Sequence, residues 1–181
     1  MPILIPLANG FEEIEAFSIV DTLRRAELEV LTVSIDHNLD VKGSHGITAK
    51  ADGKLSDWDS CPIAGVICPG GLPGTDLLVE HQPLLGLIKK IDEQKKLLAA
   101  ICAAPRVFAA AGVLEDRQVT CYPGVEFHLP MAKVLDQGVV KDGHLITGRA
   151  VGSSLDFALT IVRYLKGEGV YLKQQKSMMI R

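Results

Sequence analysis

The chain has 181 residues, and 48% of them are hydrophobic, which is enough to bury one core of ordinary domain size. Its 19 Lys and Arg nearly balance its 22 Asp and Glu, so no broad electrostatic field is available to collect nucleic acid or an anionic membrane. We therefore expect a single domain over residues 1–181, with neither nucleic acid nor a membrane as its principal partner.

The N-terminal sequence and the cysteines both predict a protein that stays in the cytoplasm. The start, MPILIPLANGFEE, lacks the basic region, apolar stretch and cleavage site of a secretory signal. The cysteines at positions 61, 68, 102 and 121 include no CxxC pair and have no compact set of companion histidines, so we predict neither disulfides nor a metal site. The apolar stretch Leu97–Leu114 is interrupted by Pro105 and Arg106, which favours a strand and a helix over a membrane span.

Short apolar runs alternate with helix-like stretches along the chain. The predicted strands are Ile3–Leu7, Val30–Ile35, Gly65–Cys68, Leu97–Cys102 and Val119–Cys121. The predicted helices are Glu12–Ala26, Pro83–Gln94, Ala103–Ala111 and Ser154–Leu165. Two further segments, VKGSHGITA and VVKDGHLIT, look like antiparallel additions near edges of the sheet. The alternation predicts an α/β fold with a mainly parallel sheet that is covered by helices on both faces.

The segment KLLAAICAAPRVFAAAG has the pattern of a buried strand that runs directly into a helix. Cys102 lies at the junction and Pro105 in the first helical turn, which is how a nucleophile elbow is built. Ligands collect beyond the carboxyl ends of strands in α/β folds, and helix N-termini favour negative charge. We therefore expect a stabilised thiolate at Cys102. The alternative is a core cysteine with no chemical role.

Two other predicted strand ends carry residues that suit the same chemistry. After the strand GVIC come Gly70 and Gly71, whose backbone amides could form an oxyanion hole, although a plain Pro-Gly-Gly turn would look the same. The first strand leads into NGFEEIEAF, where acidic residues crowd the start of a helix and complement its dipole. Of these acids, Glu15 is placed to turn its carboxylate toward the cysteine elbow.

Four motifs in order resemble the ThiJ/PfpI superfamily, and most closely its branch with the parkinsonism-associated protein deglycase and its bacterial relatives. They are Gly-Phe-Glu-Glu-Ile-Glu, Cys-Pro-Gly-Gly, Ala-Ile-Cys-Ala-Ala-Pro and Gly-Arg-Ala-Val-Gly-Ser-Ser-Leu-Asp-Phe-Ala-Leu. The likeness extends from the first strand to about Lys166. It implies a flavodoxin-like three-layer sandwich, a homodimer, and a reactive cysteine that is hydrogen-bonded to a protonated glutamate.

The resemblance also implies roles for individual residues. Cys102 and Glu15 match the reactive pair, and the oxyanion donors are the backbone amides of Gly70, Gly71 and Ala103. Arg25, together with Asp21, matches positions near the dimer interface, and His45 matches a hairpin position that approaches the partner's site. The further residues expected to line the pocket are Tyr122, Arg149, Val151, Arg25 and His45. Three positions, Ala104, Tyr122 and Val151, depart from the family pattern and leave the substrate preference open.

The leading functional hypothesis is cofactor-independent deglycase or glyoxalase chemistry on α-oxoaldehydes and their protein adducts. In it Cys102 attacks the aldehyde and Glu15 moves the proton, with neither metal nor organic cofactor. The alternative is a non-catalytic redox sensor or stress chaperone that uses oxidation of Cys102. We do not expect a peptidase, because Ala103 stands where the proteolytic branch has a histidine. His128 is the one histidine that could approach the site, although a solvated loop position is favoured.

Overall fold

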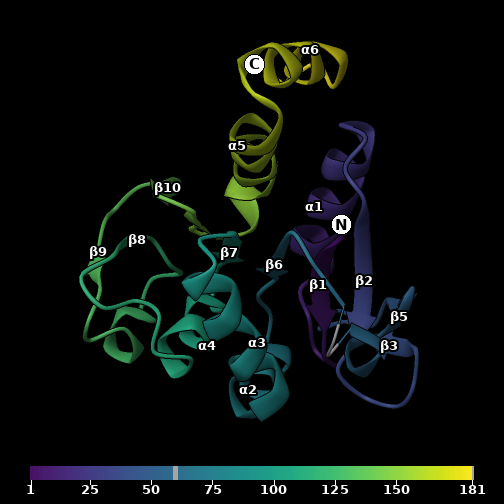
Figure 1. The fold of residues 1–181 in the computed structure, drawn as a ribbon, viewed down its shortest axis with the longest axis vertical. Coiled ribbons are helices and arrows are strands. Elements are labelled where there is room, and N and C mark those ends of the chain that lie inside the picture. The colour runs from purple at the N-terminus through teal and green to yellow at the C-terminus, as the bar shows by residue number, and fades with distance from the viewer. Residues whose placement is uncertain (59–60, 181) are drawn as a thin grey trace.

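A seven-stranded sheet runs through the middle of the molecule in this computed structural model, which describes residues 1–58 and 61–180 (Figure 1). The strand order is β10-β11-β7-β6-β1-β2-β5. The strands are β1 (Ile3–Leu7), β2 (Val30–Ser34), β5 (Gly53–Lys54), β6 (Gly65–Cys68), β7 (Leu97–Ile101), β10 (Val139–Asp142) and β11 (Leu145–Gly148). Every neighbouring pair is parallel except β10 with β11, which form an antiparallel hairpin at one edge.

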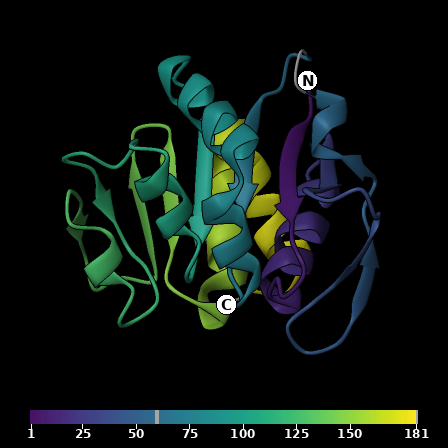
Figure 2. The ribbon, with the colours of Figure 1, turned by 90° about the horizontal axis from the view of Figure 1, so that it is seen from below.

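Helices cover both faces of the sheet, because its central strands are apolar on both faces (Figure 2). One layer consists of α1 (Glu13–Arg25) and α5 (Ser154–Lys166), and the other of α2 (Gly74–Glu80), α3 (Gln82–Glu93) and α4 (Pro105–Ala110). Along β7 the side chains alternate between the two layers: Leu97 and Ile101 belong to the α1 and α5 core, whereas Leu98 belongs to the α3 and α4 core. The result is a three-layer sandwich.

The strand order places a ligand-binding edge in this sandwich. Taken in chain order, strands β1, β2, β6, β7 and β11 are arranged 2-1-3-4-5, which is the order of flavodoxin-like doubly wound sheets. In such sheets ligands collect at the carboxyl ends of the strands, beside the point where the order reverses. Here that point lies between β1 and β6, next to the end of β7. The predicted fold class, a mainly parallel sheet with helices on both faces, is confirmed.

The structure corrects several predicted elements. The predicted strand Val119–Cys121 is not part of the main sheet, since β8 (Gln118–Val119) pairs only with β9 (Lys133–Val134) among the described strands. The reason is that the N–H of Thr120 donates to the side chain of Thr147 instead of to a strand carbonyl. The segment VKGSHGITA forms β3 (Asp40–Lys42) and β4 (Thr48–Lys50), which make a separate two-stranded sheet and no edge of the main one. The predicted edge hairpin, β10 with β11, is confirmed.

The helices also differ from the prediction in number and in bounds. Helix α2 and the C-terminal α6 (Glu168–Ser177) were not predicted, and three short 3-10 helices, η1 (Leu55–Trp58), η2 (Glu126–His128) and η3 (Val151–Ser153), lie in the connections. Helix α6 is attached to α1 by the buried side chain of Gln174, whose amide donates to the carbonyl of Thr22. None of the helices in residues 1–58 and 61–180 is long and apolar enough to cross a membrane.

Candidate active site

Cys102 occupies a sharp turn between β7 and α4. Its φ angle is +63°, a left-handed conformation that is uncommon for residues other than glycine. Hydrogen bonds hold it there: its N–H donates to the carbonyl of Gly148 at 3.0 Å, and its own carbonyl accepts from the N–H of Tyr122 at 2.9 Å. Strand β7 ends at Ile101, one residue before its predicted end, and α4 begins at Pro105, two residues after its predicted start, because residues 102–104 form the turn. The predicted elbow is therefore present.

Glu15 lies in the first turn of α1 and is completely buried. The side chain of Glu12 caps this helix by accepting a hydrogen bond from the N–H of Glu15 at 2.6 Å. One carboxylate oxygen of Glu15, Oε2, accepts from the N–H of Gly70 at 2.8 Å. The other, Oε1, is buried and has no geometrically regular hydrogen-bond partner among the described residues. Burial, which is the largest effect, raises the pKa of Glu15 to about 7.

Gly70 separates the cysteine from the glutamate. A Cβ atom at this position would lie 2.7 Å from Cβ of Cys102 and 2.7 Å from Oε2 of Glu15, so no larger residue fits without moving one of them. The predicted role of Gly70 as an oxyanion donor is wrong, because its N–H is already used by Glu15. The N–H groups of Gly71 and Ala103 face the sulfur of Cys102 and favour its ionised form. Their role as oxyanion donors stays a prediction.

The thiol and the carboxyl group compete for one proton. Burial, the negative charge of Glu15 and the hydrogen bond with Glu15 raise the pKa of Cys102 to about 12, against the opposing effect of the Ala103 and Gly71 amides. The expected stabilised thiolate is therefore not found while Glu15 is ionised, because burial and Glu15 outweigh the helix N-terminus. Ionisation of either group opposes ionisation of the other, so the two titrate as a pair.

His45 is bound to the first turn of α1 in its own chain. Its backbone N–H and its Nδ1 lie 2.7 Å and 2.9 Å from the carboxylate oxygens of Glu13, and this contact fastens the β3–β4 hairpin beside Glu15. Burial would raise the pKa of Glu13, but hydrogen bonds from His45 and Ile47 lower it to about 2. The side-chain oxygens of Glu12 and Glu13 and a ring nitrogen of His45 lie within 4.8 Å of one another, a spacing that could hold a metal ion. The carboxylate of Glu13, however, is already occupied by hydrogen bonds from the β3–β4 hairpin.

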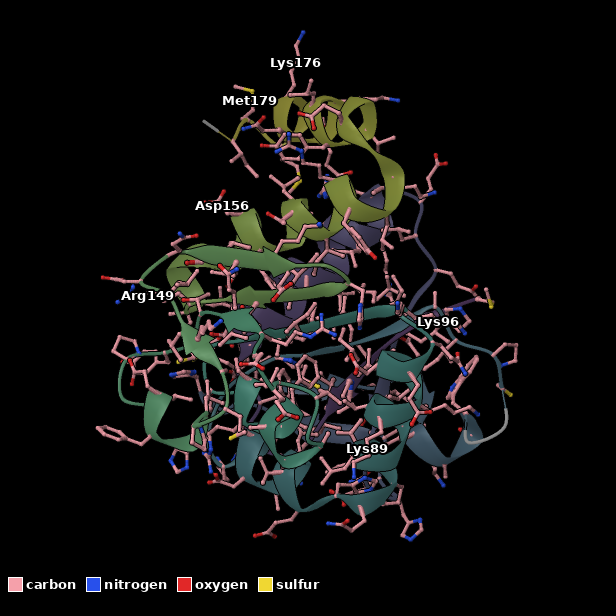
Figure 3. All side chains as sticks on the ribbon, turned by 60° about the vertical axis from the view of Figure 1, so that its left-hand side comes forward. Lys89, Lys96, Arg149, Asp156, Lys176 and Met179 are labelled. Carbon is pink, nitrogen blue, oxygen red and sulfur yellow. The ribbon has the colours of Figure 1, made fainter. Side chains whose placement is uncertain are left out.

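The structure separates the other predicted pocket residues. Tyr122 is joined to Cys102 through its backbone and is half exposed. Arg149 pairs with Asp136 and lies at the periphery of the molecule (Figure 3), and Val151 is partly exposed in η3. Arg25 does not lie beside Glu15 in its own chain: it follows Glu15 by ten positions, which is about 15 Å along the helix axis. It pairs with Asp21 at 2.7 Å on the exposed side of α1.

Two contributions to the site were missed by reasoning from the sequence. The sequence places Glu12 only among several acids that complement the helix dipole, whereas in the structure it caps the helix through the N–H of Glu15. Its position three residues before Glu15 is the usual spacing of such a cap and could have indicated this role. The sequence indicates Gly70 as an oxyanion donor, whereas in the structure its lack of a side chain is what lets Cys102 and Glu15 lie close together. His128 is exposed and lines a pocket behind α4.

The fold and the site together define a class: α/β proteins of flavodoxin-like topology with a cysteine on a strand-to-helix turn and a buried glutamate beside it. The family model of the DJ-1/PfpI family matches residues 1–164. The chain belongs to the DJ-1/PfpI family.

Several relatives and solved structures are similar to this chain. DJ-1 homolog B of Arabidopsis thaliana is 38% identical over 92% of the chain, which spans only 38% of that protein's length. Protein dj-1beta of Drosophila melanogaster is 35% identical over 98% of the chain and 96% of its own length. Its crystal structure has a TM-score of 0.96 at 34% identity, covering 99% of this chain and 98% of that one. Oxidized DJ-1 of Toxoplasma gondii has a TM-score of 0.94 at 31% identity, covering 98% and 97%.

A more distant relative carries an activity in its name. A deglycase of Pyrococcus abyssi is 29% identical over 92% of this chain and 100% of its own length.

Proposed function

We propose that the protein is a cytoplasmic, cysteine-dependent enzyme that converts methylglyoxal or glyoxal, and the adducts they form with proteins, without a cofactor. The observation that carries this proposal is the pairing of Cys102 with the buried carboxyl group of Glu15 across Gly70. A carboxyl group with a pKa near 7 can both take and give a proton at neutral pH, which is what a general acid–base catalyst needs.

The first chemical step is the addition of the thiol to the aldehyde. Glu15 accepts the thiol proton, the sulfur of Cys102 forms a bond to the aldehyde carbon, and the carbonyl becomes an alkoxide. The N–H groups of Gly71 and Ala103, which face the sulfur, would donate to that oxygen. Return of the proton from Glu15 to the oxygen gives a neutral hemithioacetal.

The second step moves two protons within the bound substrate. The carboxylate of Glu15 takes the hydrogen of the former aldehyde carbon while the neighbouring carbonyl oxygen gains a proton, which gives an enediol. Glu15 then returns its proton to the neighbouring carbon and the hydroxyl group on the first carbon gives up its own, which restores the proton used at the second oxygen and leaves a thioester on Cys102. Water then cleaves the thioester and restores the thiol. Methylglyoxal and water together become lactate, and no oxidant or reductant is consumed.

The comparison with known proteins supports this chemistry at the level of the family. The Pyrococcus relative is named a deglycase, and the chain matches that protein over its whole length. An activity on protein adducts would use the same attack by Cys102 at the carbon that carries the adduct.

Lactate formation from methylglyoxal tests the proposal. We expect the wild type to form lactate in buffer with a metal chelator, and Cys102→Ser to form none. Glu15→Gln should lower the rate by about 10²–10⁴-fold, since a positioned acid or base contributes that much. Cys61→Ser is the matched control, because Cys61 is exposed and its sulfur contacts only the carbonyl of Asp57 among the described hydrogen bonds. Equal rates for the wild type and Cys102→Ser would refute the mechanism.

A second candidate, a redox sensor or stress chaperone, rests on the buried Oε1 atom of Glu15. This atom lacks a partner among the described residues, so a Glu15 protonated at Oε1 could donate a hydrogen bond to an oxygen of oxidised Cys102. Toxoplasma DJ-1, whose structure resembles this one, has been solved in an oxidized form. A wild type that forms no lactate but is oxidised selectively at Cys102 would favour this second function.

A further inference from the structure

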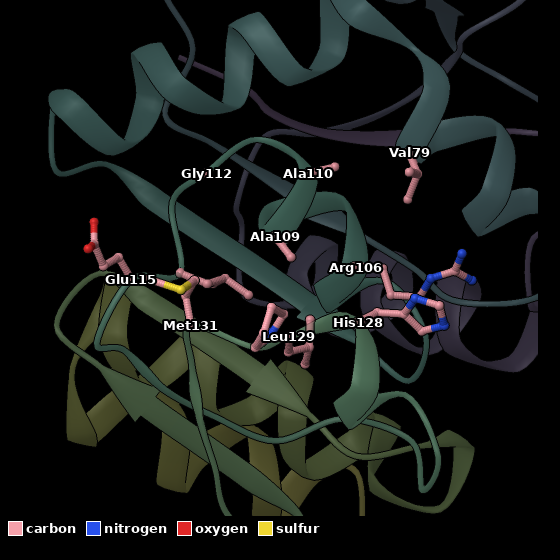
Figure 4. A pocket seen from close by; sticks show the side chains of 11 residues that line it. Val79, Arg106, Ala109, Ala110, Gly112, Glu115, His128, Leu129 and Met131 are labelled. Carbon is pink, nitrogen blue, oxygen red and sulfur yellow. The ribbon is translucent and has the colours of Figure 1, made fainter.

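A pocket of about 440 Å³ lies behind the helix that follows Cys102 (Figure 4). Its walls come from α4, from the turn after this helix, and from the segment that follows η2. Most of the wall is apolar, and the main contributors are Ala109, Ala110, Leu114, Leu129, Pro130 and Met131. Cavities of this size accommodate small organic ligands, whereas a folded helix or a long peptide would not fit.

The polar groups of the pocket are divided between its two ends. In the view of Figure 4, Arg106 and His128 lie at one end and Glu115 at the other. The guanidinium of Arg106 is held by Asp76 through Nη1 at 2.8 Å. Asp76 does not line the pocket, and its carboxylate both orients the guanidinium and offsets part of its charge. A guanidinium has five donors in a fixed fork, so this contact leaves other N–H groups for a ligand.

We propose that this pocket binds a small carboxylate with an apolar body. The carboxylate would lie against Arg106 and His128, because guanidinium groups bind carboxylates through paired, charge-assisted hydrogen bonds. The hydrocarbon part would cover Ala109, Leu129 and Met131, which offer no polar partner. Glu115 at the far end disfavours a ligand with a second negative charge. The site is separate from the chemistry proposed at Cys102, although both lie along α4.

Binding of 3-phenylpropionate to the full chain tests this proposal, with 3-phenylpropionamide as its neutral counterpart. We expect amide signals of α4 and of residues 128–131 to shift in ¹H–¹⁵N spectra, and the carboxylate to bind about tenfold or more tightly than the amide. Arg106→Gln should weaken carboxylate binding by about tenfold or more and leave amide binding nearly unchanged. Ala109→Leu should weaken both, since the added side chain fills the cavity.

Two controls separate this site from the rest of the molecule. Lys89→Gln removes an exposed cation on α3, outside the pocket, and should leave binding unchanged. Cys102→Ser should also bind the carboxylate normally, whatever the outcome of the lactate assay. The proposal is overturned if the carboxylate and the amide bind equally, if Ala109→Leu binds both as the wild type does, if Cys102→Ser abolishes binding, or if no signal in the pocket shifts at millimolar concentration.

Discussion

The backbone N–H of Gly70 donates a 2.8 Å hydrogen bond to Oε2 of Glu15, 55 residues earlier in the chain. This contact joins the turn after β6 to the first turn of α1, and it holds the carboxyl group beside Cys102 at the end of β7. The segments that follow three strands thus supply Glu15, Cys102 and the glycine between them. The proposed chemistry depends on these three residues lying together.

Replacing Gly70 by Ala should disable the site without unfolding the protein. The new Cβ would lie 2.7 Å from both Cys102 and Glu15, so at least one of them must shift. A displacement of about 1 Å in an active site can cost about 10²-fold in rate, and we expect a loss of that order in lactate formation. Gly86→Ala is the matched control: a Cβ in this helix meets nothing within 4 Å and should stabilise the fold by about 0.4–1 kcal/mol. Full activity of Gly70→Ala would show that the spacing is unimportant.

Glu15→Gln should stabilise the protein above neutral pH. Because the pKa of Glu15 is raised from 4.5 to about 7 by burial, the folded state holds the proton more tightly than the unfolded state. The stability of the wild type should therefore fall as the pH rises from about 4.5 to about 7, by an amount on the order of 3 kcal/mol. The glutamine variant should not lose stability in this pH range. Urea unfolding at pH 4.5 and pH 8 gives the free energy of unfolding of both proteins, with the exposed Glu80→Gln as control. A stability difference between wild type and Glu15→Gln that is the same at both pH values would contradict the prediction.

The protein should form a homodimer through one face of α1. Ile14 and Phe17 are 57% and 40% exposed, and Asp21 and Arg25 continue the same face two and three turns after Ile14. Exposed apolar residues clustered on one helix face indicate an interface. We expect light scattering to give twice the mass of one chain for the wild type and the monomer mass for Phe17→Lys. Leu172→Lys, which changes an exposed leucine of α6, should remain dimeric; a monomeric wild type would exclude the interface.

Mild peroxide should oxidise Cys102 before the other cysteines and stop at the sulfinate. Cys102 is partly exposed and faces the amides of Gly71 and Ala103, whereas Cys68 and Cys121 are buried. Burial raises the pKa of all three thiols, that of Cys121 to about 11 and that of Cys102 to about 12. Access of peroxide and the neighbouring proton acceptor Glu15, rather than a low pKa, therefore favour Cys102. Cys121 packs in the core cluster on the α4 side of the sheet, whereas Cys102 packs against the cluster on the α1 side.

Peptide mass spectrometry after graded peroxide treatment measures this oxidation. Glu15→Leu should give less sulfinate, because it removes the hydrogen-bond donor expected to stabilise the product. Leu has nearly the size of Glu, so the variant tests the donor with little change in the space that is filled. Oxidation of the exposed Cys61 with Cys102 left untouched would contradict the assignment of Cys102 as the reactive thiol.

The sequence by itself determined the fold class, the main strands and helices, and the cysteine at the turn. These follow from local patterns: short apolar runs such as Leu97–Ile101 are typical of buried strands, and Pro105 suits the start of a helix. The strand Val119–Cys121 was wrong because its apolar pattern could not reveal that Thr120 would bond to the side chain of Thr147.

The tertiary structure decided what the local patterns leave open, above all which side chains meet. Only folding brings the N–H of Gly70 to Glu15, which turns a predicted oxyanion donor into a positioning contact. Only folding decides the protonation of Cys102 as well. Burial and the charge of Glu15 raise its pKa by more than the helix N-terminus indicated by the sequence lowers it. The structure likewise sets Arg25 about 15 Å from Glu15 along the same helix, so Arg25 of the same chain does not adjoin the acid–base pair. Charge, burial and distance depend on three strand ends that are far apart in the chain, and no sequence window contains them.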